Sequence, residues 1–188
     1  MTVVPESVGK FTALRTLSLS YCFYLAALPE SVGNLGALQM LRLSNCTNLA
    51  ALPESVGNLS ALRTLNLSEC YELTALPESV GNLGTLHTLH LAWCEKLTAL
   101  PESVGTLGAL HSLILESCWK LKTLPASISQ LTQLDEASRK HVEAMLRGKL
   151  TAPPFALVSI RARVVRCVAV RYTNAVAAAT ARCAKTPR

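Results

Sequence analysis

Three of the four histidines lie at positions that suggest a metal site or a catalytic base. His87 and His111 share a 24-residue spacing, and His90 follows closely after the first of them. No carboxylate or cysteine accompanies them at the spacing of zinc ligands, and no nucleophile–base–orienter set is recognisable. The sequence therefore predicts a non-enzymatic chain, with no catalytic residue, no metal site and no cofactor.

The cysteines show a more regular spacing. Five of the seven recur with the same 24-residue spacing, at Cys22, Cys46, Cys70, Cys94 and Cys118. This is not the spacing of a zinc site or of a CxxC redox pair. Disulfides between neighbouring strands are one alternative. We favour a row of reduced, buried thiols that act as small apolar side chains.

The 24-residue interval that separates the cysteines is also the length of a sequence repeat that covers most of the chain. The hexapeptide LPESVG or a variant of it occurs six times, at 4–9, 28–33, 52–57, 76–81, 100–105 and 124–129. Five full repeats and the start of a sixth therefore occupy residues 4 to 134.

Two apolar spacings alternate within each repeat. Leu65 and Leu67 are two residues apart, which is the period of a strand with one buried side. Val56, Leu59 and Leu62 are three apart, which suits a 3-10 or helical turn. Each repeat is thus predicted to form a strand, a bend and a tight helical return, stacked in parallel on its neighbours. The cysteine after the strand can donate to a backbone carbonyl that the bend leaves free.

The pattern LxxLxxLxLxxCxxLxx followed by LPxxVG resembles that of leucine-rich repeat proteins over residues 4–134. The resemblance implies an α/β solenoid: a right-handed superhelix of 24-residue repeats, with a parallel concave sheet and short helical or 3-10 turns on the convex side. The LPxxVGxL segment resembles the repeats of plant disease-resistance (nucleotide-binding/leucine-rich-repeat) receptors. It is also similar to Ras-scaffold-type intracellular repeat proteins. The sequence contains no GxxxxGK[ST] segment, so it corresponds at most to the sensing part of such a receptor.

A binding surface is predicted where the repeats differ from one another. The residues between and just after the strand leucines point away from the core onto the concave face, and they vary in charge, size and polarity while the framework barely varies. We interpret them as contacts for a protein or peptide ligand. The alternative is that exposed positions vary in sequence without any functional constraint. The predicted contacts are Tyr21, Met40, Arg42, Asn45, Asn66, Glu69, His90, Trp93, Ile114 and Glu116.

Charge is divided unevenly along the chain. Residues 1–134 carry seven Lys or Arg against nine Glu, or −2, whereas residues 135–188 carry eleven against three acidic residues, or +8. The nearly neutral repeats predict no nucleic-acid groove. Residues 135–150 are expected to form a capping helix, in which Val142, Met145 and Leu146 lie on one side together with Leu131 and Leu134. Residues 151–188 are expected to form a poorly ordered basic tail. The alternatives for the tail are a weak anchor on anionic surfaces and a folded element.

Neither a signal peptide nor an apolar run of about 20 residues is visible, so we expect no transmembrane segment and a cytoplasmic or nuclear, not secreted, protein. The first repeat has nothing before it to cover its apolar side, which suggests missing upstream repeats or an association partner.

The leading hypothesis is a protein interaction module in plant-type defence recognition or signalling. The alternatives are a signalling scaffold of the Ras-scaffold type and a fragment of a larger receptor with no independent function.

Overall fold

The structure is a computed structural model that describes residues 4–147. In this part of the chain each repeat contributes one short helix and one three-residue strand. The strands are β1 (Thr16–Ser18), β2 (Met40–Arg42), β3 (Thr64–Asn66), β4 (Thr88–His90) and β5 (Ser112–Ile114). The 3-10 helices are η1 (Glu6–Lys10), η2 (Glu30–Asn34), η3 (Glu54–Asn58), η4 (Glu78–Asn82), η5 (Glu102–Thr106) and η6 (Ala126–Gln130), followed by α1 (Glu136–Leu146).

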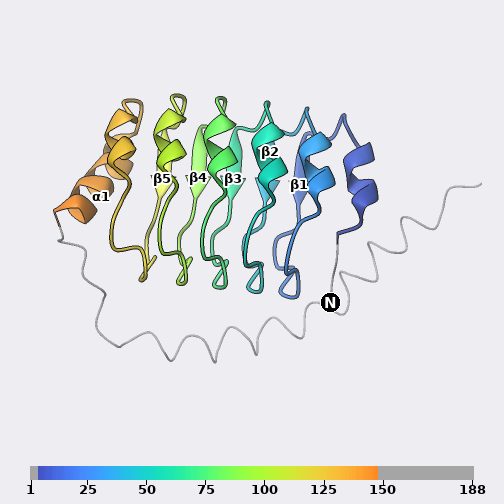
Figure 1. Cartoon of the computed structure of the whole chain (residues 1–188), viewed down its shortest axis with the longest axis horizontal. Coiled ribbons are helices and arrows are strands. Elements are labelled where there is room, and N and C mark those ends of the chain that lie inside the picture. Colours follow the sequence, from blue (N-terminus) through green and yellow to red (C-terminus); the bar gives the residue numbers. More distant parts are fainter. Residues whose placement is uncertain (1–3, 148–188) are drawn as a thin grey trace, which may run out of the picture. The chain divides into compact units, whose positions relative to one another are not determined.

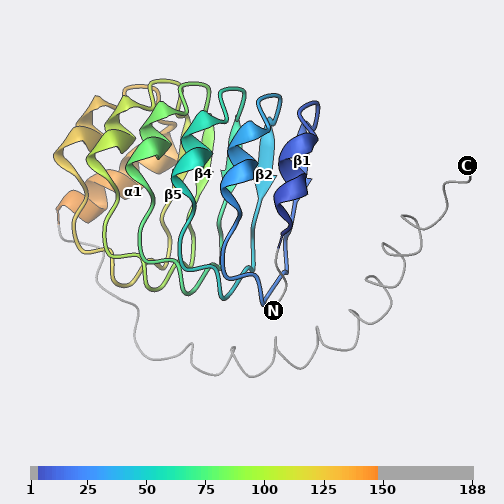
Figure 2. The same ribbon diagram turned by 45° about the vertical axis from the view of Figure 1, so that its right-hand side comes forward.

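The strands form one parallel sheet in the order of the sequence, β1-β2-β3-β4-β5. Each strand residue pairs with its equivalent in the next repeat, as Leu41 does with Leu65. The 3-10 helices stack in a second layer alongside the sheet (Figure 1), and the same row of helices is seen from another angle in Figure 2. The predicted leucine-rich-repeat solenoid is confirmed. We number the repeats by their strands, so that the third repeat contains β3.

The 3-10 helices begin where the sequence places proline. Pro53 has φ −69° and ψ 153°, an extended conformation that leads directly into η3, and its missing N–H costs nothing at a helix start. Glu54 follows in the first turn, where a negative charge is favourable. The structure adds a second role for this glutamate, because its Oε2 accepts a hydrogen bond from the Ser79 N–H of the next repeat at 3.4 Å. The glutamates thus link successive helices as well as starting them.

The helices of adjacent repeats approach one another closely at a glycine. A Cβ atom added to Gly57 would clash with the Ser79 carbonyl oxygen and would lie 2.6 Å from the Ser79 Cβ. This close contact means that Gly57 sets the spacing between neighbouring repeats.

The core between the two layers is built from leucines and cysteines. Leu65, Leu67 and Cys70 of the third repeat have no exposed surface. The predicted hydrogen bond from the cysteine to a backbone carbonyl is confirmed, because the Cys70 Sγ donates to the Leu43 carbonyl oxygen at 3.2 Å. The same contact joins Cys46 to Leu19, Cys94 to Leu67 and Cys118 to Leu91. All five of these cysteines are free thiols.

The start of α1 takes the place of a sixth strand. The Asp135 N–H donates to the His111 carbonyl oxygen at 2.7 Å, and the Leu113 N–H donates to the Ser138 Oγ at 3.0 Å. The Asp135 carboxylate caps the helix by accepting from the Ser138 N–H at 2.7 Å. These bonds satisfy part of the outer edge of β5, which would otherwise remain unpaired.

One expectation about α1 was wrong. The sequence places Leu146 on the buried side together with Val142, but Leu146 is 58% exposed. The buried side is centred on Ser138 and Val142, with Met145 packed beside them, and Leu146 lies at its margin. The described helix ends within the predicted capping segment, and the predicted tail 151–188 lies outside the described residues.

Candidate functional site

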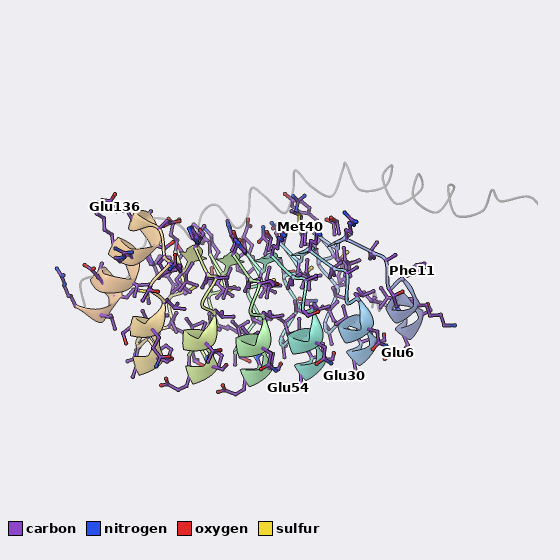
Figure 3. All side chains as sticks on the ribbon, turned by 90° about the horizontal axis from the view of Figure 1, so that it is seen from above. Glu6, Phe11, Glu30, Met40, Glu54 and Glu136 are labelled. Carbon is purple, nitrogen blue, oxygen red and sulfur yellow. The ribbon has the colours of Figure 1, made fainter. Side chains whose placement is uncertain are left out.

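Five of the ten predicted contacts lie on the strands themselves. Arg42, Asn66, His90 and Ile114 are register partners on successive strands, and we call them the concave row. Met40 lies on the same side of the molecule, opposite Glu30 and Glu54 of the helical layer (Figure 3). Parallel strands lie about 4.8 Å apart, so the concave row presents a cation, an amide, an imidazole and an aliphatic group at regular steps.

The members of the concave row differ in how accessible they are. Arg42 is exposed, whereas Asn66, His90 and Ile114 are half-buried. The Asn66 Oδ1 accepts a hydrogen bond from the Ser68 N–H at 3.0 Å, so part of this amide is used within its own strand. Partial burial lowers the pKa of His90, because burial penalises the charged imidazolium. His90 is therefore predominantly neutral at pH 7, and Arg42 is the one formal positive charge in the row.

Four more predicted contacts occupy an unusual backbone conformation just after the strands. Positive φ angles occur at Tyr21 (66°), Asn45 (61°), Glu69 (63°), Trp93 (63°) and Ser117 (60°), which we call the left-handed positions. Asparagine tolerates this conformation, but bulky side chains adopt it rarely and at a cost. Backbone hydrogen bonds hold it in place, as when the Trp93 N–H donates to the Glu116 carbonyl oxygen at 2.7 Å. Glu116, the tenth predicted contact, is exposed.

Aromatic side chains gather in the same turns. We define the aromatic edge as Tyr21, Phe23, Tyr24, Tyr71, Trp93 and Trp119. Two pairs are in edge-to-face contact: Tyr21 with Phe23 at 6.3 Å between ring centroids, and Trp93 with Trp119 at 6.2 Å. The Tyr71 hydroxyl donates to the Glu69 Oε2 at 3.2 Å.

Sequence reasoning found only Tyr21 and Trp93 of this edge. Phe23, Tyr71 and Trp119 share one repeat position, just beyond the left-handed position, because whole repeats separate them from one another. That shared position was the available signal. It was missed because this position was treated as part of the bend and not as part of the surface.

Two of the three histidines singled out by the sequence lie against each other. The His87 and His111 rings stack at 6.4 Å between centroids, as their shared repeat position predicts, and the His87 Nδ1 lies 2.7 Å from the Thr85 carbonyl oxygen. Within residues 4–147, no three His, Cys, Asp or Glu side chains gather in a group that could hold a metal ion. None of the helices in the same range has the length and apolar character needed to cross a bilayer.

The chain is similar to several solved structures. The Arabidopsis receptor kinase HAESA, in complex with the peptide hormone IDA and the co-receptor SERK1, is 28% identical with a TM-score of 0.52, covering 71% of this chain and 27% of that one. A plant ice-binding protein is 25% identical with a TM-score of 0.50, covering 68% and 41%. The leucine-rich repeat domain of the type III effector XopL is 24% identical with a TM-score of 0.41, covering 71% and 63%. This chain thus spans less than two thirds of each of these proteins.

The family assignment comes from the sequence. No curated protein matches the chain. A family model described as a leucine-rich repeat region matches residues 54–151, which is more than half of the 188 residues. Folds of this kind are typical of protein–protein interaction modules and are generally non-catalytic. The chain therefore belongs to the leucine-rich repeat family.

Proposed function

We propose that this chain is a non-catalytic recognition module that binds a protein or peptide on its concave face. The observation that carries the proposal is the contrast between two sets of repeat positions. Leu41, Leu65 and Leu89 are the same residue and have no exposed surface. The concave row beside them changes from Arg42 to Ile114 within four strands. A fixed scaffold with a varied face is what selective recognition requires.

The left-handed positions support this proposal. Asparagine or glycine would relieve the backbone strain there, yet Tyr21, Glu69 and Trp93 occupy three of the five positions. Tyrosine and tryptophan are also the side chains that most often anchor protein interfaces. Side chains held at a cost in stability, shortly after the strands that carry the concave row, are best explained by contacts with a partner.

The size of the surface favours a macromolecular ligand. Five strands at about 4.8 Å extend roughly 20 Å, which matches an extended peptide or a protein surface better than an enclosed metabolite. HAESA, which has a related fold at 28% identity, was solved with a peptide hormone bound. A peptide or protein ligand is therefore the class that we assign to this chain.

The proposed setting is plant-type defence recognition or signalling in the cytoplasm. The alternative is an intracellular scaffold of the Ras-scaffold type, and a further alternative is a piece of a larger receptor that does not act alone. A nucleotide-binding domain encoded beside these repeats would favour the receptor, whereas a free-standing gene would favour the scaffold.

The test is to select peptides from a random display library on the full chain and to measure their affinity for variants. Arg42→Ala and His90→Ala should each weaken the selected peptides by about tenfold or more, because truncation of an interface anchor costs about 1–2 kcal/mol. The melting temperature of Arg42→Ala should not change, because this side chain is exposed, and that of His90→Ala should change only slightly, because this side chain is half-buried and outside the core. Lys10→Ala is the matched control, since Lys10 is exposed in η1 of the convex layer. Peptides that bind equally well to all three variants would refute concave-face recognition.

A further inference from the structure

Aromatic side chains are concentrated on one edge of the described structure. Six of the seven aromatic residues in residues 4–147 belong to the aromatic edge, and Phe11 is the other one. Tyr24 is 68% exposed, Tyr21 46% and Trp119 38%. The edge continues the concave face into the turns that follow the strands, since Trp93 comes shortly after the end of β4 at His90.

The part of this edge that spans the third to fifth repeats is also acidic. The turns 69–72, 93–96 and 116–120 contain four glutamates and two lysines. Lys96 is paired with Glu72 at 2.5 Å. Glu69 occupies the left-handed position one repeat before Trp93, and Glu116 is bonded through its carbonyl oxygen to the Trp93 N–H. Trp93 therefore has an acidic residue on the neighbouring repeat at each side.

The geometry of the tryptophan pair leaves the faces of one ring uncovered by the other ring, and Trp119 is 38% exposed. The two rings are inclined at 86°, so one ring presents its edge to the other. The faces of the edge-presenting ring are then not covered by its partner ring. An indole face carries the negative part of the ring quadrupole and attracts cations, and nearby carboxylates add to this attraction.

We propose that the partner docks an arginine or lysine side chain on the acidic, tryptophan-bearing part of the aromatic edge. This inference rests on the proposed function, because it names the chemistry of the protein or peptide that the concave face receives. The guanidinium of arginine fits best, since it stacks on an aromatic face and pairs with a carboxylate at the same time.

The charge at the other ends of the strands, where each strand begins, supports this assignment. The residues just before the strands are Arg15, Gln39, Arg63, His87 and His111, all of which are exposed and none of which is acidic. The sign of the charge therefore reverses across the strands. A partner is oriented with its cationic side chain toward the turns after the strands.

Intrinsic fluorescence can test the proposal directly, because the two tryptophans of the chain are Trp93 and Trp119. Each ion's quenching constant is divided by its constant for free N-acetyltryptophanamide. On this normalised scale caesium should quench the emission of the full chain more strongly than iodide, because a negative potential concentrates cations around the rings. Acetyl-tetraarginine amide should change the emission in a saturable way that weakens with added salt, and acetyl-tetraglutamate amide should not. Equal quenching by both ions, or equal responses to both peptides, would overturn the inference. Saturation by cellohexaose without a response to tetraarginine would also overturn it and would assign the edge to carbohydrate.

A conservative variant separates charge from folding. The double variant Glu69→Gln/Glu116→Gln keeps the size of both side chains, so the melting temperature should stay unchanged while tetraarginine affinity falls at least fivefold. Glu6→Gln on the convex layer is the matched control and should bind like the unaltered chain. An unchanged affinity in the double variant would reject the cation site.

The outcomes also distinguish this inference from the proposed function. Display-selected peptides that lose affinity with Arg42→Ala but not with the double variant would leave concave-face recognition standing and reject the cation site. Conversely, charge-dependent tetraarginine binding together with selected peptides that ignore Arg42→Ala would support the cation site and reject concave-face recognition.

Discussion

The first and third repeats carry the same apolar residues in and just after their strands but bury them to different extents. Leu65, Leu67 and Cys70 of the third repeat have no exposed surface. Their equivalents in the first repeat, Leu17, Leu19 and Cys22, are only partly buried. Within the described residues, β3 pairs with strands on both sides, whereas β1 pairs only with β2. The comparison shows that a repeat owes part of its burial to each neighbour, so the stability of a position depends on its place in the stack.

Truncation of the equivalent leucines is the strongest test of this comparison. Leu65→Ala should lower the free energy of unfolding by about 3–5 kcal/mol, because it removes a fully buried side chain and leaves a cavity. Leu17→Ala should cost about 1–2 kcal/mol, since this side chain already keeps part of its exposure and little cavity is formed. Urea unfolding followed by circular dichroism measures both values. Equal losses would mean that the first repeat is covered in solution as well as the third.

The pH dependence of stability that comes from the buried thiols is a second way to compare the first and third repeats. Burial, and next the charge of neighbouring Cys46, raise the pKa of Cys70 to about 12, from 9.0 for an ordinary thiol. In the unfolded chain this thiol ionises first, so its contribution to stability is complete below pH 9 and is lost as the pH rises toward 12. Cys70→Ala should therefore flatten the decline of the free energy of unfolding above pH 9, by up to about 1.4 kcal/mol per pH unit.

Cys22→Ala is the control in the first repeat. Burial also raises the pKa of Cys22, but this side chain is less buried. Its replacement should change the pH dependence less than Cys70→Ala does. Urea titrations at pH 8, 9 and 10 on both variants isolate the thiols, because every other titrating group is common to the two proteins. A larger change for Cys22→Ala would contradict the role of stacking in thiol burial.

The smallest expected effect on stability comes from substitutions at the left-handed positions, and it should be the same in the first and third repeats. Glu69→Asn and Tyr21→Asn should each raise the free energy of unfolding by about 0.5–1 kcal/mol, because asparagine tolerates the left-handed conformation. The strain is local, so it should not depend on the place in the stack. Ser68→Asn, at a neighbouring position without a positive φ, should give no such gain. Thermal unfolding in matched buffers measures these differences. A gain in stability for Ser68→Asn would show that asparagine does not stabilise the chain through relief of backbone strain at a positive φ.

The repeat geometry was predictable from the sequence because it depends on identical residues at identical spacing. Leu65 and Leu67 predict the strand, and Pro53 predicts the start of η3. The thiol-to-carbonyl contact of Cys70 was also predictable, since a small donor follows each strand. The residues that form these features recur from repeat to repeat, so each copy supports the interpretation of the others.

The surface was less predictable because its residues share position but not chemistry. Tyr21, Asn45, Glu69 and Trp93 have nothing in common as side chains, and so nothing in their types indicates a shared positive φ. The contact between Trp93 and Trp119 crosses from one repeat to the next and from one turn position to another. Periodicity along a single position cannot reveal a pair of this kind.

The hydrogen bond from each cysteine to the preceding repeat has a consequence for how such a protein changes over evolutionary time. The joint between Cys70 and Leu43 is chemically the same as the joint between Cys94 and Leu67. Unequal recombination that gains or loses the codons of one whole repeat therefore creates no new packing problem at the seam. Gain or loss of whole repeats can thus change the length of the recognition surface, while point substitutions change the surface residues of each repeat independently.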